Sequence, residues 1–105
     1  MPVKEFNGIS IEVDDDGHMV DWKEWNEDIA RGLARDLGID ELTDDHWKVI
    51  NFLRSEYEKN GAASTLRTIG KQSGVDIKGL YKIFPEKPLR KSAVVAGLPK
   101  PKSCV

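Results

Sequence analysis

Cysteine is nearly missing from this sequence, and long apolar runs are missing altogether. One cysteine among 105 residues excludes a disulfide within the chain, and no group of cysteines and histidines has the spacing of metal ligands. No stretch approaches the roughly 20 apolar residues that cross a bilayer, and the opening residues MPVKEFNGIS lack the apolar core of a signal peptide. Glycine-rich phosphate loops and serine-nucleophile motifs are also missing. We therefore expect a cytoplasmic protein with no membrane contact and no cofactor.

The composition is that of one ordinary globular domain, but its charge is divided unevenly. Residues 1–63 carry 7 basic and 16 acidic groups, a balance of −9, whereas residues 64–105 carry 9 basic and 2 acidic groups, a balance of +7. Such a division has two interpretations. Either the basic part faces an anionic partner, with nucleic acid as one possibility, or the two parts attract each other within the domain.

The first third of the chain predicts a β-hairpin followed by a helix. Residues 3–20 are rich in turn signals and β-branched residues, and Asn7-Gly8 suits a tight hairpin turn. Apolar residues then recur at steps of three and four over residues 21–38, which predicts a helix begun by Asp21 or by Asn26. The tryptophans of this segment share the apolar face, so we expect them in the core rather than stacked on a ligand.

The remainder predicts further helices. Residues 43–60 form the clearest pattern, with Thr43 as N-cap, and His46 in the first turn is expected to be structural or at the surface. Two shorter helices, 64–74 and 76–84, are expected to begin at Ser64 and Asp76 and resemble a helix-turn-helix. Residues 86–97 are expected to hold one more helical turn. The predicted fold is thus a mostly α single-domain bundle with a small N-terminal β-hairpin.

The helix-turn-helix supports a hypothesis of its own, a DNA-binding regulator. Its second helix carries Lys78, Tyr81 and Lys82, which suit contacts to phosphates and base edges. It lacks the arginine, asparagine and glutamine side chains best suited to bidentate base contacts. Helix pairs of this kind are also common as plain packing units, so the element alone does not establish DNA binding.

The only thiol belongs to Cys104, one residue from the end, in the stretch GLPKPKSCV. A terminal segment can enter the active site of another protein. Pro99 and Pro101 would stiffen it, while Lys100 and Lys102 would favour the nucleophilic thiolate and guide docking. The alternative is an incidental cysteine in a terminal segment. We expect a domain over residues 1–95 and a flexible C-terminal arm over residues 96–105.

Three stretches resemble one family. The ending AGLPKPKSCV, and in support DDHWKVINFLRSEY and LYKIFP, resemble the DsrC/TusE family of small sulfur-carrier proteins, which are related to the gamma subunit of dissimilatory sulfite reductase. The resemblance implies a small, mostly helical fold with a helix-turn-helix-like element and a mobile C-terminal arm. It also implies that Cys104 carries sulfur as a persulfide, in a relay rather than in turnover of a small molecule by this protein alone.

One departure from the family pattern concerns the second cysteine. Two-cysteine members have a thiol eleven positions before the penultimate cysteine, where this chain has Ala93. Unless Ala93 replaces a native cysteine, the pattern is that of the single-cysteine members. These resemble relays that take sulfur from an upstream persulfide-donor sulfurtransferase and pass it to an acceptor such as a tRNA thiolation enzyme. The alternative implied by the resemblance is a gamma-subunit-like partner of a sulfite reductase.

Overall fold

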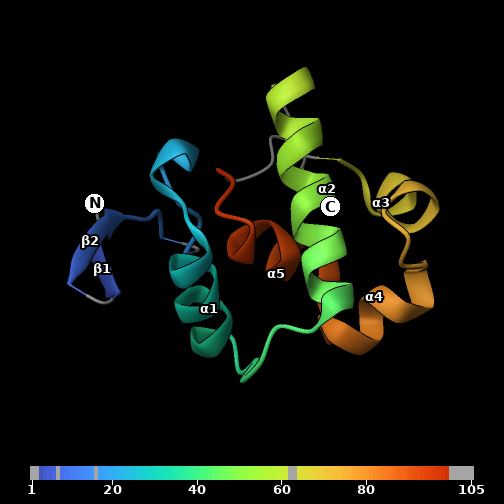
Figure 1. Cartoon of the computed structure of the whole chain (residues 1–105), viewed down its shortest axis with the longest axis horizontal. Helices are drawn as coiled ribbons and strands as arrows, with labels where there is room; N and C mark the ends of the chain where they lie inside the picture. Colours follow the sequence, from blue (N-terminus) through green and yellow to red (C-terminus); the bar gives the residue numbers. More distant parts are fainter. Residues whose placement is uncertain (1–2, 7, 16, 62–63, 100–105) are drawn as a thin grey trace.

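The secondary structure consists of a short hairpin followed by helices, as predicted. A computed structural model of the chain describes residues 3–6, 8–15, 17–61 and 64–99. Its elements, in chain order, are β1 (Val3–Phe6), β2 (Ile9–Glu12), the 3₁₀ helix η1 (Trp22–Glu24), α1 (Glu27–Asp36), α2 (Asp44–Asn60), α3 (Leu66–Gln72), α4 (Ile77–Ile83) and α5 (Pro88–Val95). This confirms the predicted fold class (Figure 1).

The hairpin docks on α1 at one end of the molecule. Strands β1 and β2 pair antiparallel, with Phe6 opposite Ile9. Phe6 lies against the backbone of Gly32, where a Cβ atom would come within 2.9 Å of the ring carbon Cγ. A glycine inside α1 therefore leaves room for the aromatic ring. Lys4 adds an ion pair of 2.9 Å to Asp36 at the end of the same helix.

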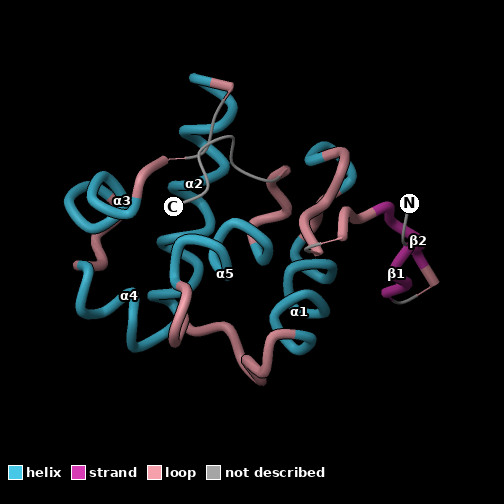
Figure 2. Tube along the Cα trace, turned by 180° about the vertical axis from the view of Figure 1, so that it is seen from behind, coloured by secondary structure: helices cyan, strands magenta, loops and turns pink. Residues whose placement is uncertain are grey.

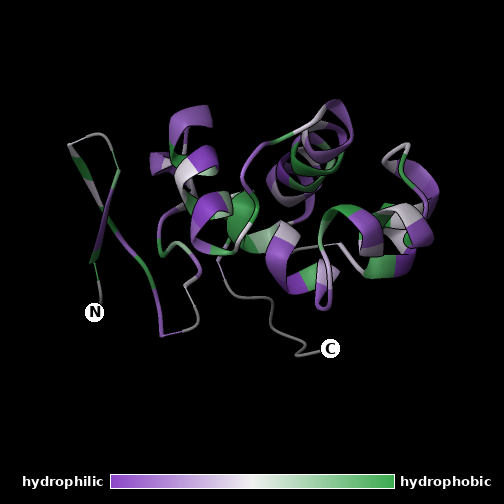
Figure 3. Ribbon diagram, turned by 90° about the horizontal axis from the view of Figure 1, so that it is seen from below, coloured by the Kyte–Doolittle hydropathy of each residue, from purple (hydrophilic) through white to green (hydrophobic). Residues whose placement is uncertain are grey.

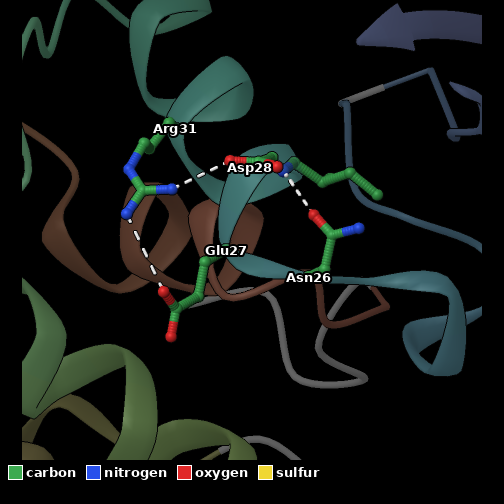
Figure 4. Close-up of polar contacts among 5 residues, drawn as sticks. Asn26, Glu27, Asp28 and Arg31 are labelled. Atoms are coloured by element: carbon green, nitrogen blue, oxygen red, sulfur yellow. Dashed lines mark hydrogen bonds and ion pairs between the residues drawn. The ribbon is translucent and has the colours of Figure 1, made fainter. Parts of the chain in front are cut away.

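Both candidate N-caps of the first helical segment are used. Asp21 accepts a hydrogen bond from the backbone N–H of Lys23 and begins η1, and Asn26 accepts one from Ile29 and begins α1 (Figure 4). Trp25 between them has an extended backbone, with φ −71° and ψ 145°. The single helix predicted over residues 21–38 is therefore wrong in detail, because two caps in succession restart the helix.

Helix α5 is the centre of the fold. It packs against α1, α2 and α4 (Figures 1 and 2). Most of it is buried, with Ser92, Ala93, Val94 and Val95 at its C-terminal half. The prediction of one further helical turn here was too short, since the segment forms a helix of eight residues. Its burial on several sides leaves it without the one-sided pattern that marks a surface helix.

The hydrophobic core falls into two clusters. The larger lies among all five α-helices, and the smaller lies under the hairpin against α1 and α5. Trp25 and Leu37 pack against both clusters and so join them. Hydrophobic and hydrophilic residues alternate around the helices, as burial of one face requires (Figure 3). Both tryptophans of the first helical segment pack on the core, which confirms that prediction.

The helix-turn-helix-like element consists of α3 and α4. Asp76 accepts a hydrogen bond from Gly79 and caps α4 as predicted, but α3 is capped by Thr65 rather than Ser64, so that prediction was wrong by one residue. The two helices approach closely at Gly70, where a Cβ atom would lie 2.7 Å from Cγ1 of Ile77.

His46 joins the start of α2 to the end of α4. The backbone N–H of Thr43 donates to its Nδ1 atom (2.9 Å), so that nitrogen carries no proton. Its Nε2 atom therefore carries the proton and donates to the carbonyl oxygen of Ile83 (2.9 Å). The ring also meets Phe84 edge to face, with centroids 5.1 Å apart. His46 is structural, one of the two roles expected for it.

Among the described residues, no helix combines the length and the apolar character needed to cross a membrane. The same residues contain no cluster of three or more histidine, cysteine or acidic side chains that could hold a metal ion.

Candidate functional site at the end of helix α5

The candidate site residues of the sequence lie at or beyond the end of the described chain. Pro99 is described and is half-buried. Cys104 and the flanking Lys100, Pro101 and Lys102 lie outside the described residues, so their roles stay predictions. The structure does describe the segment that leads to them. We call residues Val95–Leu98 the arm root.

The backbone of the arm root ends α5 with a tight reversal. The N–H of Gly97 donates to the carbonyl oxygen of Val94 (3.0 Å), and the N–H of Leu98 donates to that of Ala93 (3.1 Å). Gly97 has φ +72°, and Leu98 is fully buried. This pair of hydrogen bonds around a left-handed residue is the Schellman motif. The first residues of the predicted arm are thus packed in the core, and the boundary at residue 96 stays a prediction.

Two side chains from elsewhere in the sequence bind the carbonyl groups of the arm root. The indole Nε1–H of Trp25 donates to Val95 (2.9 Å), and the guanidinium of Arg54 donates through Nη1 to Ala96 (2.8 Å). The last carbonyls of a helix have no partner within it, so these bonds satisfy groups that would otherwise be left unpaired. Arg54 also donates through Nη2 to the carbonyl oxygen of Trp22 (3.0 Å).

The guanidinium of Arg54 lies on the faces of two aromatic rings. Its central carbon is 4.1 Å from the ring centroid of Trp25 and 5.1 Å from that of Trp22. Burial lowers the pKa of Arg54, an effect that the nearby carboxylate of Glu58 opposes. Indole faces and carbonyl oxygens stabilise a cation that has lost much of its water. We call Trp22, Trp25 and Arg54 the Trp–Arg clamp.

Sequence reasoning did not find the clamp. Trp25 was expected in the core, and no role was expected for Arg54. A signal was present, because Arg54 falls between Ile50 and Tyr57 on the apolar stripe of α2, at spacings of four and three residues. A charged residue on such a stripe indicates a buried polar contact.

The ion pairs bear on the two interpretations of the divided charge. Ion pairs of Lys4, Arg31, Lys48 and Lys59 all join residues within positions 1–63. Within the described part of the chain, the basic residues of α3 and α4 form no such pair; these are Arg67, Lys71, Lys78 and Lys82. The structure therefore leaves both interpretations of the divided charge open.

Ala93 is the position at which the family resemblance places the second thiol of two-cysteine members. It is fully buried in α5, and its carbonyl oxygen accepts the hydrogen bond from Leu98. With a methyl group at this position, Cys104 is the only thiol of the chain.

Comparison with known proteins gives one consistent result. The family model described as "DsrC like protein" matches residues 5–105. The sulfurtransferase TusE homolog of Haemophilus influenzae is 41% identical over 107 residues, covering 94% of this chain and 96% of its own length. The gamma subunit of the dissimilatory-type sulfite reductase of Nitratidesulfovibrio vulgaris is 37% identical over 100 residues, or 95% of each chain. The crystal structure of the oxidized gamma subunit (DsrC) from Archaeoglobus fulgidus matches with a TM-score of 0.86 and 37% identity, covering 99% of this chain and 100% of its own. The chain therefore belongs to the family of DsrC-like proteins.

Proposed function

We propose that this protein is a sulfur carrier that accepts sulfur as a persulfide on Cys104 and relays it to a partner protein. The supporting observation is the single thiol at the penultimate position of a chain that matches the family through its last residue. The proposal agrees with the similarity to the Haemophilus influenzae protein, which is named a sulfurtransferase TusE homolog. A lone thiol also suits a relay, because the chain has no second thiol to displace the bound sulfur as a disulfide.

The transfer step needs no redox cofactor. The thiolate of Cys104 attacks the outer sulfur of a cysteine persulfide on the donor protein. A new sulfur–sulfur bond forms to Cys104 while the donor's own sulfur–sulfur bond breaks, and the donor cysteine leaves as a thiolate. The sulfur atom keeps its oxidation state. Lys100 and Lys102 favour the attacking thiolate, and Pro99 and Pro101 limit the entropy lost on docking.

The partners in this proposal are an upstream persulfide-donor sulfurtransferase and a downstream acceptor such as a tRNA thiolation enzyme. The basic residues of α3 and α4 suit an acidic surface on a partner protein. A cytoplasmic location fits the chemistry, since thiols there stay reduced. The hypothesis of a DNA-binding regulator has the helix-turn-helix geometry in its favour, but none of the comparisons supports contact with nucleic acid.

Intact-mass spectrometry tests the carrier function. The chain is incubated without reductant with a cysteine desulfurase or a rhodanese-type sulfurtransferase that carries a persulfide. We expect a gain of one sulfur atom that reductant removes. The Cys104→Ser variant should gain none and should unfold at the same urea concentration as the wild type. Sulfur acceptance that persists in Cys104→Ser would contradict the assignment of the thiol.

A second candidate function is a gamma-subunit-like partner of a dissimilatory sulfite reductase, favoured by the match to the subunits of Nitratidesulfovibrio vulgaris and Archaeoglobus fulgidus. With Ala93 in place of the second thiol, it predicts docking to the reductase without an internal disulfide. Size-exclusion chromatography of the chain mixed with a purified dissimilatory sulfite reductase decides between stable docking and none.

A further inference from the structure

Side chains from two distant parts of the sequence meet at the arm root. Arg54 extends from α2 and Trp25 follows η1, and their bonds to Ala96 and Val95 span 42 and 70 residues of sequence. The ring of Trp25 also packs against the guanidinium of Arg54, which binds the carbonyl oxygen of Ala96. The point at which the chain leaves the core is therefore fixed by the rest of the fold and not by α5 alone.

Packing alone does not require an arginine at this place. The lowered pKa of Arg54 shows that burial disfavours its charge, and buried ionic groups are often replaced by apolar residues without loss of stability. What the guanidinium supplies is direction, because its planar fork points two N–H donors at two carbonyl oxygens at once. One of these carbonyls belongs to the arm root and the other to η1.

We propose that Trp25 and Arg54 are positioning residues for the thiol of Cys104, because they fix the origin from which the last residues reach a donor or an acceptor. The inference rests on the proposed carrier function. Cys104 lies six residues beyond Leu98. At about 3.5 Å per residue, this limits the reach of the thiol to roughly 20 Å from the end of the arm root.

The expected loss in the effective concentration of the thiol follows from the number of residues that join it to the last held residue. If the arm root were released, Val94 would become the last held residue, and ten residues instead of six would separate it from the thiol. The effective concentration of a tethered group falls roughly as the −3/2 power of tether length, so release lowers it about twofold. The effective concentration falls further because the chain no longer leaves the arm root in a fixed direction.

The test uses the double variant Trp25→Phe/Arg54→Lys. Phenylalanine keeps an aromatic ring but has no N–H group for Val95, and lysine keeps the charge but lacks the fork. The matched control is Trp47→Phe/Arg31→Lys, a second arginine–tryptophan pair with the guanidinium carbon 5.6 Å from the ring centroid. Arg31 lies on α1, where it pairs with Glu27 and Asp28 (Figure 4), and no bond of it to the arm root is found among the described residues.

Three measurements separate positioning from a general loss of structure. Sulfur transfer from a persulfide-loaded rhodanese-type sulfurtransferase, measured at several carrier concentrations, should show a kcat lowered at least about twofold with KM unchanged. Alkylation of Cys104 by iodoacetamide should keep the wild-type rate, because the chemistry of the thiol is unaltered. Amide hydrogen exchange at Gly97 and Leu98 should become faster than the change in global stability explains.

The outcomes distinguish the inference from the function on which it rests. A wild-type chain that accepts no sulfur from any donor overturns both. A wild type that accepts sulfur, with a double variant that shows faster exchange at the arm root but an unchanged kcat, overturns the positioning role alone. An equal loss of kcat in the control variant would also overturn it, since the effect would then not depend on the arm root.

Discussion

Replacement of Gly97 by alanine tests how tightly the arm root is packed. A left-handed conformation is unfavourable by about 1–2 kcal/mol for a residue with a Cβ atom, and Gly97 has φ +72°. The added atom would also lie 2.6 Å from Cγ of Trp25 and 2.9 Å from the sulfur of Met19. Overpacking of this kind costs about 1–3 kcal/mol, while the stiffer unfolded chain returns about 0.4–1 kcal/mol. We expect Gly97→Ala to lose about 3 kcal/mol of unfolding free energy.

Gly38 provides a matched control. It ends α1 in the same motif, with φ +84° and hydrogen bonds from Gly38 to Arg35 and from Ile39 to Ala34. A Cβ atom there would meet nothing within 4 Å. Gly38→Ala therefore adds backbone strain and stiffens the unfolded chain but causes no overpacking. It should lose about 1 kcal/mol of unfolding free energy.

Urea denaturation measures both losses, since a small domain of this kind is expected to unfold in one cooperative step. The midpoint of Gly97→Ala should fall well below that of Gly38→Ala while the slope m stays constant. Equal losses in the two variants would refute the reasoning, because the contact between Gly97 and the ring of Trp25 would then carry no energy.

Two further predictions concern the contacts at the C-terminal end of α4, and the same denaturation assay measures both. His46→Ala leaves the backbone groups of Thr43 and Ile83 without partners and should cost about 3 kcal/mol, whereas Lys48→Ala on the exposed side of α2 should stay within about 0.5 kcal/mol of the wild type. Phe84→Ala empties a fully buried site and should cost about 3–5 kcal/mol. A loss for either variant no larger than that for Lys48→Ala would contradict the burial and bonding described here.

Local chemistry explains why much of the fold was predictable. Asp21, Asn26 and Asp76 cap helices because a short acceptor side chain can bind N–H groups two or three residues later, whatever the rest of the chain does. Ser64 and Thr65 offer the same hydroxyl chemistry side by side, so sequence alone did not separate them. The candidate thiol is likewise visible in sequence, since it is the only one.

Long-range contacts explain what was missed. Helix α5 is buried against three helices, and burial on several sides erases the periodicity by which helices are recognised. The role of Arg54 depends on carbonyl groups 32 and 42 residues away, which no local pattern displays. Both omissions concern the arm root, so sequence reasoning identified the candidate thiol but not the side chains that bind the segment leading to it.

The two ends formed by Gly38 and Gly97 show what the clamp adds. Both helices stop by the same backbone reversal, yet within the described part of the chain only the end of α5 has an indole and a guanidinium bound to its carbonyls. Ending a helix does not require such contacts, as α1 demonstrates. Under the proposed carrier function the thiol must reach two partners, and each residue added between it and the last held residue dilutes it at both. Under that proposal, holding the chain as far as Leu98 leaves six residues to Cys104, and this gives a reason for a desolvated arginine at the end of α5 that the end of α1 lacks.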